Sequence, residues 1–297
     1  MQIAHRSIES WVQLLSDQEI PVMRQTARGL AEAVQRIDTI HGRSVAAIVL
    51  HDPLMTVRVL RFTVRHHAKR QLKEISTVEH AVMMLGIEPF FKYFANLDIV
   101  EDQLKTHPQS LLGLLQTMRR SQRAAFYATD WAASRRDLNV EEVTVAALLH
   151  DLAEILMWCF APAEVLQIQA MQKADHAMRS ADAQQAVLGF PLIELQLALC
   201  KKWQLPELLL HLIDDAQSEH PRVRNVKLAV DLARHSAHGW DDPALPDDFT
   251  AIEKLMNLDH AVLLERLGVP PKPEAAAATD STPEEGSKPE PDSGFWH

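Results

Sequence analysis

A histidine followed directly by an aspartate, His150-Asp151, interrupts the apolar stretch AALLHDLAEIL, which runs from Ala146 to Leu156. Imidazole and carboxylate groups suit divalent metal ions, and a metal held by them activates water and polarises a phosphoryl oxygen. A charged pair in an apolar segment is costly unless it is ligated or paired with opposite charge. The doublet therefore indicates either a metal site or a structural pair whose charges are satisfied inside the protein.

A second group of residues that could take part in binding or catalysis consists of basic side chains. A helix beginning near Pro53 would place four cationic side chains along one face, because they recur at three- and four-residue spacing: Arg58, Arg61, Arg65 and Lys69. The simplest interpretation is a solvated helix face. The functional alternative is an anionic partner, such as a nucleotide, RNA, an acidic peptide or the acidic tail of the chain itself. Few aromatic residues accompany these arginines, which gives little support to base stacking.

Composition narrows the function classes. The net charge is −10 over 297 residues, and residues 270–297 contribute −4 of it through six acidic and two lysine side chains. This acidity disfavours general binding of nucleic acid. The chain has only 2 cysteines, too few for a disulfide framework or a cysteine-based zinc site. No export signal is evident, and no uncharged apolar run is long enough to cross a membrane, so we expect a cytoplasmic protein.

The elements that position these residues are predicted to be helices throughout. Only 9 glycines are present, and helix-favouring residues dominate, so we expect an all-α fold of roughly a dozen helices. Pro53 fits the first turn of a helix, and Ser76–Glu79 is typical of a capping box. Thr250 with Glu253 indicates another capping box. The doublet itself is expected inside one continuous helix between Asn139 and Pro162.

The composition changes after Gly268. The last segment is rich in Pro, Glu, Ala and Ser and has little to bury before Phe295 and Trp296. A segment of this composition cannot offset the entropy of ordering. We therefore predict a folded body over residues 1–268 and a disordered, acidic, Pro-rich tail over residues 269–297.

The folded body resembles the HDOD domain, an HD-related output domain of bacterial signalling proteins. The resemblance runs from about Ile20 to about His238 and depends on an ordered set of segments: EIPVM, VAAIVLHDPLMTVRVLRF, ISTVEHAVMMLG, AALLHDLAEIL, VLGFPLIELQLALCKKWQLPELLLHLI and NVKLAVDLARH. It implies an N-terminal helical subdomain, about residues 1–110, packed on an HD-like helical bundle, about residues 111–268.

The resemblance also implies a site. Metal-dependent phosphohydrolases of the wider HD superfamily have a histidine, then the His-Asp doublet, then a distant aspartate. The doublet corresponds to His150-Asp151 and the distant acid to Asp231, whereas Arg120 in the segment Met118–Ser121 takes the place of the first histidine. A guanidinium has only donors and cannot ligate a cation. It can form a forked ion pair with Asp151 or Asp231 and so replace the metal electrostatically.

Two further departures from the family point the same way. In the family an Asp-His pair often follows the Leu-Gly sequence, but this chain has Pro191-Leu192 there. The family's usual His-His pair after the Leu-Pro helix is replaced by Asp214-Asp215. The leading hypothesis is therefore a non-catalytic signalling or regulatory module with a vestigial HD site, which uses no cofactor and binds a protein partner. The alternatives are a metal-dependent phosphohydrolase using His150, Asp151 and Asp231, and a nucleotide- or RNA-binding regulator using the basic face.

Overall fold

The computed structural model describes residues 6–67, 76–175 and 178–271. Within these ranges the chain forms seventeen α-helices and two 3₁₀-helices, with no β-strand and one isolated bridge between Val22 and Ile99. The predicted all-α class is confirmed, but the expected dozen helices were too few. The predicted disordered tail falls outside the described residues from position 272 onward, and so does Lys69.

The helices are short except for one long helix, α8. In chain order they are α1 (Ile8–Ser16), α2 (Arg24–Val34), α3 (Gly42–Val49), α4 (Pro53–His67), α5 (Val78–Leu85), α6 (Ile87–Tyr93), α7 (Val100–Gln103), α8 (Pro108–Ser134), α9 (Val140–Leu149), α10 (Leu152–Phe160), α11 (Pro162–Ala174), α12 (Ser180–Leu188), α13 (Leu192–Lys202), α14 (Glu207–Ile213), η2 (Asp215–Gln217), α15 (Pro221–His235), η3 (Ser236–His238), α16 (Leu245–Met256) and α17 (His260–Leu267).

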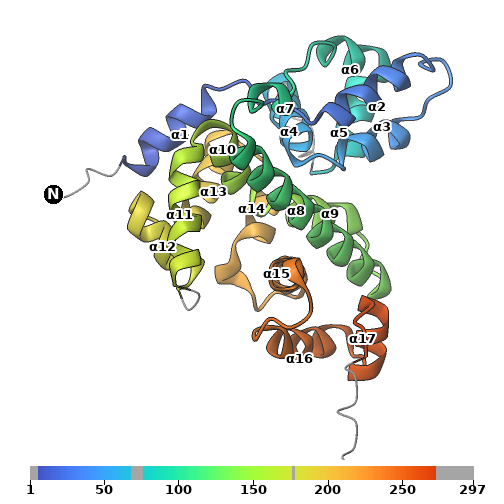
Figure 1. Cartoon of the computed structure of the whole chain (residues 1–297). Helices are drawn as coiled ribbons and strands as arrows, with labels where there is room; N and C mark the ends of the chain where they lie inside the picture. The colour runs from blue at the N-terminus through green and yellow to red at the C-terminus, as the bar shows by residue number, and fades with distance from the viewer. Residues whose placement is uncertain (1–5, 68–75, 176–177, 272–297) are drawn as a thin grey trace, which may run out of the picture.

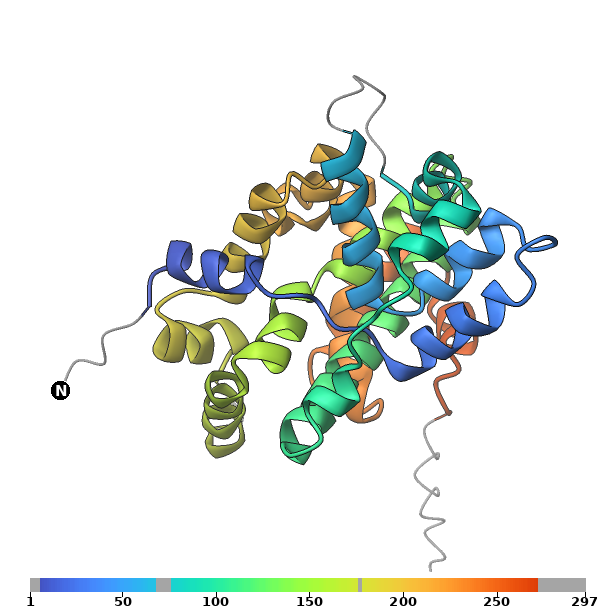
Figure 2. The ribbon, with the colours of Figure 1, turned by 90° about the horizontal axis from the view of Figure 1, so that it is seen from above.

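Helix α8 is the central helix of the fold. It packs along α9, α10 and α15, while α2 to α7 gather at one end and α15 to α17 lie on the opposite side of α8 and α9 (Figure 1). The view from above shows α1 apart from α2 to α6 (Figure 2). Although α1 falls within the residues assigned to the N-terminal subdomain, it packs on α13 of the bundle. The connection between α1 and α2 therefore runs from α1, which lies on α13, to the group of helices that begins with α2.

Buried and half-buried capping groups decide where the N-terminal helices begin. The fully buried Asp52 accepts hydrogen bonds from the backbone N–H groups of Met23, Leu54 and Met55, so α4 starts at Pro53 as predicted. The cap of α5 is Thr77, whose hydroxyl accepts from the N–H of His80 at 3.2 Å. This cap lies one residue later than the capping box that the sequence indicated.

The predicted capping box at Thr250 is wrong. Helix α16 begins at Leu245, so Thr250 lies in its interior and donates its hydroxyl to the Pro246 carbonyl at 3.0 Å. Glu253 instead accepts from His260 at the start of α17. The proline after Leu245 occupies the first turn, where its missing N–H costs nothing, and this favours the earlier start.

The contact between α8 and α10 depends on Gly113. A Cβ atom at this position would lie 2.4 Å from the ring of Trp158, which is fully buried. The indole N–H of Trp158 donates to the Thr117 hydroxyl at 3.2 Å, and that hydroxyl donates to Glu154 at 2.9 Å. The absence of a side chain at Gly113 thus lets the two helices approach and fixes Glu154 near the site described below.

We expect Gly113→Ala to lower the free energy of unfolding by about 1 to 3 kcal/mol, because overpacking displaces the rigid indole. Gly29→Ala is the matched control, since its Cβ would come no closer than 3.2 Å to a neighbouring side chain, the Cγ2 atom of Ile48. Alanine favours helix over glycine by about 1 kcal/mol, so the control should lose little or gain. Chemical denaturation measures both. Equal effects of the two substitutions would show that the close approach at Trp158 is unimportant.

Among the described residues, one stretch, Val140–Phe160, is long and apolar enough to cross a membrane by length and composition. Of its most apolar window, 78% is buried inside the protein. The pair α12 and α13 passes the same test only as one segment bent by 70°. Such burial is typical of a core helix.

Candidate functional site

The His150-Asp151 doublet lies at a break between two helices, and the single continuous helix expected here is wrong. Helix α9 ends at Leu149 and α10 begins at Leu152. The buried Gln196 of α13 bridges the break: its amide donates to the Leu149 carbonyl at 2.8 Å and accepts from the Ala153 N–H at 2.7 Å. Backbone groups freed by the break are thus satisfied, and both side chains of the doublet face the bundle interior.

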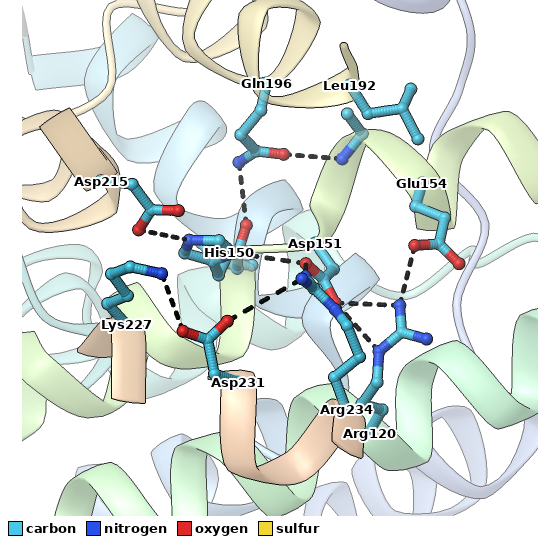
Figure 3. A network of polar contacts seen from close by, with 12 residues as sticks. Arg120, His150, Asp151, Glu154, Leu192, Gln196, Asp215, Lys227, Asp231 and Arg234 are labelled. Atoms are coloured by element: carbon cyan, nitrogen blue, oxygen red, sulfur yellow. Dashed lines mark hydrogen bonds and ion pairs between the residues drawn. The ribbon is translucent and has the colours of Figure 1, made fainter. Parts of the chain in front are cut away.

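Arg120 on α8 reaches the doublet. Its Nε and Nη2 atoms both donate to Oδ2 of Asp151, at 3.1 and 2.9 Å, and Nη2 also donates to Glu154 at 2.7 Å (Figure 3). Burial opposes the charge on Arg120, but the carboxylates of Glu154 and Asp151 raise the pKa of Arg120 above its ordinary value. Burial likewise opposes ionisation of Asp151, yet Arg120 above all holds the pKa of Asp151 well below its usual range. Both groups are therefore charged.

His150 lies between two carboxylates. Nδ1 is 3.2 Å from Asp151 Oδ1 and Nε2 is 3.4 Å from Asp215 Oδ1. Burial disfavours the imidazolium, but hydrogen bonds to Asp151 and Asp215 outweigh it and raise the pKa of His150 to about 9. Both ring nitrogens are therefore engaged by carboxylates, and a metal would bind the ring only by displacing a proton.

The distant acid Asp231 belongs to the same network. Lys227, one turn earlier on α15, donates to its Oδ2 atom at 2.7 Å. Arg234 lies 3.9 Å from Asp231 and 3.5 Å from Asp151, so it connects the two acids (Figure 3). Asp231 is thus paired with Lys227 and Arg234. Of the two acids expected to pair with Arg120, it is Asp151 that does so.

In this arrangement each carboxylate lies beside a cationic group of the protein. Carboxylates and cations alternate through the network, which consists of Arg120, His150, Asp151, Glu154, Asp215, Lys227, Asp231 and Arg234. Among the described residues, no three His, Cys, Asp or Glu side chains are grouped so that they could hold a metal ion. Every acid that the HD pattern supplies is already turned toward a cation of the protein.

A cavity of about 390 Å³ opens above the network. Arg120, His150 and Asp151 line its charged part, while Leu192 and Ile168 belong to its apolar part. The cavity therefore gives small molecules access to the ion pairs.

All four residues singled out for the vestigial site, Arg120, His150, Asp151 and Asp231, come together in this network. Sequence reasoning missed Glu154 and Arg234, although each lies three residues after a predicted acid and so shares its helix face. It also missed that Asp215 would face His150. No local spacing connects the break after α9 with η2, so the sequence carries no signal for that pair.

The basic face of α4 is less uniform than its spacing suggested. Arg58 donates to the Ile20 carbonyl and lies 3.4 Å from Glu19. Arg61 donates to the Ser16 carbonyl at 2.6 Å. Both guanidinium groups thus hold the connection between α1 and α2, whereas Arg65 is exposed.

The sequence model of the HDOD domain matches residues 20–219, and the chain belongs to the HDOD family. The match begins where the resemblance did and ends before Asp231. Among solved structures, a virulence factor of Campylobacter jejuni is similar with a TM-score of 0.66 at 19% identity, covering 88% of this chain and 96% of its own. The MmoQ response regulator of Methylococcus capsulatus has a TM-score of 0.61 at 15% identity, covering 86% and 96%. No curated protein matches this chain. These structural similarities establish the fold.

Proposed function

We propose that this chain is a non-catalytic HDOD signalling module that works in the cytoplasm by binding a protein partner. The observation that supports this most is the seating of Arg120 on Asp151 and Glu154, at 2.9 and 2.7 Å, where the HD pattern has a histidine. The contacts of both His150 nitrogens with carboxylates and the Lys227–Asp231 pair add to it, because they engage the remaining ligand groups.

The same network supports a scaffolding role. It cross-links α8, α10, η2 and α15 through charged groups that range from buried to about 40% exposed, so these elements are held in one arrangement. A surface fixed in this way is suited to recognition by a partner protein. The structurally similar protein of Methylococcus capsulatus is described as a response regulator, which is compatible with a role in signalling.

Metal analysis of the purified full-length protein tests the proposal. After incubation with Mn²⁺ or Zn²⁺ and gel filtration, we expect no stoichiometric metal and no hydrolysis of phosphomonoesters, phosphodiesters or cyclic dinucleotides. The rival function is a metal-dependent phosphohydrolase using His150, Asp151 and Asp231. Near-stoichiometric metal that is lost in Asp151→Ala would establish the rival. Asp130→Ala is the matched control, because Asp130 is also paired with an arginine but lies outside the network.

A further inference from the structure

A separate cavity of about 420 Å³ lies between the α1–α2 connection, α4 and the end of α6. None of the residues of the ion-pair network lines it. Its cationic lining comes from Arg58, Arg61 and Arg65, and its aromatic lining includes Phe62 and Tyr93. Cationic and aromatic groups therefore meet in one hollow that neither the family pattern nor the proposed function uses.

Arg65 is the cation available to a ligand. It is exposed, and the described residues offer it no hydrogen bond or ion pair. Next to it, the Nε atom of Arg61 is buried without a hydrogen-bond partner. Burial and then the charge of Arg65 lower the pKa of Arg61 to about 10. Positive charge is thus concentrated here, and an anion in the cavity would relieve the repulsion.

Two acidic residues also line the cavity, of which one accepts from a neutral amide and the other is paired with a cation. Asp17 accepts a hydrogen bond from Gln13 at 2.7 Å, and Glu19 lies 3.4 Å from Arg58. Among residues 6–67, 76–175 and 178–271, no carboxylate is paired with Arg65. The part of the cavity next to Arg65 is therefore the part that favours negative charge.

Aromatic rings lie beside these cations. Phe62 and His66 are stacked with centroids 3.8 Å apart, and Tyr93 of α6 lies 4.5 Å from Phe62. Tyr93 is 51% exposed. The ring surface of Tyr93 is available to a planar group, and nucleotide bases stack on rings of this kind.

We propose that this cavity binds a nucleotide, with the phosphate on Arg65 and the base on the ring of Tyr93. Arginine matches the geometry of phosphate oxygens, and the aromatic rings supply the surface that a base requires. The same chemistry serves a free nucleotide or a nucleotide within single-stranded RNA. This site is independent of the proposed function, since it shares no residue with the vestigial HD site.

Isothermal titration calorimetry on the full-length protein at low ionic strength tests the proposal. The probes are AMP, adenosine, inorganic phosphate and a short oligoadenylate RNA. We expect AMP to bind about tenfold more tightly than adenosine or phosphate, because only AMP uses both parts of the cavity. Arg65→Ala and Tyr93→Leu should each weaken binding about tenfold. Leucine keeps an apolar contact with Phe62, so this variant is expected to fold.

Arg28→Ala is the matched control, because it removes an exposed arginine of α2 outside the cavity. It should bind AMP as the unmodified protein does. Binding of the RNA but not of AMP, with the same loss in Arg65→Ala and Tyr93→Leu, would identify the strand as the source of the nucleotide. The proposal is overturned if no probe binds, or if both cavity variants bind AMP or RNA as tightly as the control.

Discussion

Replacing Arg120 by methionine lowers the free energy of unfolding by about 3 to 5 kcal/mol, because it leaves buried carboxylates without their cation. The side chains of Arg120, Asp151 and Glu154 are 19%, 11% and 23% exposed, so water replaces the lost hydrogen bonds only in part. Methionine keeps most of the volume of the arginine stem, and the loss therefore reports charge more than packing. Urea denaturation at neutral pH measures it.

The control is Arg266→Met, which removes a guanidinium from a comparable pair. Arg266 donates from Nε and Nη2 to the two oxygens of Asp130, both at 2.8 Å, but these side chains are 32% and 37% exposed. An exposed pair of this kind contributes less than about 1 kcal/mol. If Arg120→Met costs no more than Arg266→Met, the network does not depend on Arg120, and another cation must neutralise Asp151.

Raising the pH from 6 to 10 should destabilise the protein by roughly 3 kcal/mol through His150 alone. Its pKa is raised from 6.5 to about 9 in the folded state, so folding favours the protonated ring. The stabilisation is complete below the unfolded value of 6.5 and is lost as the pH rises through about 9. Melting temperatures at intervals of pH follow this loss.

His150→Gln isolates the contribution of the imidazole. The buried thiols of Cys159 and Cys200 also have raised pKa values because of burial, and they destabilise the folded state at alkaline pH in both proteins. Their effect cancels in the difference between the unmodified protein and the variant. Parallel stability curves between pH 6 and 9 would mean that His150 is neutral in the folded protein, and the lone pair on one ring nitrogen would then be free for a metal.

Helix class and some helix starts could be predicted from the sequence because they depend on neighbours in the chain. Pro53 begins α4 as expected, since proline fits the first turn of any helix. Thr250 shows the limit of this reasoning: its spacing to Glu253 matches a capping box, yet the helix starts earlier, at Leu245. Local signals of similar strength compete, and packing of the whole chain decides between them.

The candidate site, too, was predictable from the sequence only in part. The resemblance to the HDOD family identified Arg120, His150, Asp151 and Asp231, and helical spacing alone could have added Glu154. Two other features had no local signal: Asp215 opposite His150, and the break after Leu149 that Gln196 bridges. They join segments from different helices, and no spacing along the chain encodes such contacts.

The basic face of α4 makes the difference clearest. The sequence by itself determined that Arg58, Arg61 and Arg65 share one side of a helix, because helical geometry sets the direction of each side chain. Only the tertiary structure decided that two of them hold backbone carbonyls, while Arg65 has no hydrogen bond or ion pair with the described residues and lines the same cavity as Tyr93. The physical reason is that the geometry of one helix sets only the directions of its own side chains. Which residues of α1 and α6 come to lie beside them depends on how the helices pack to bury the common core.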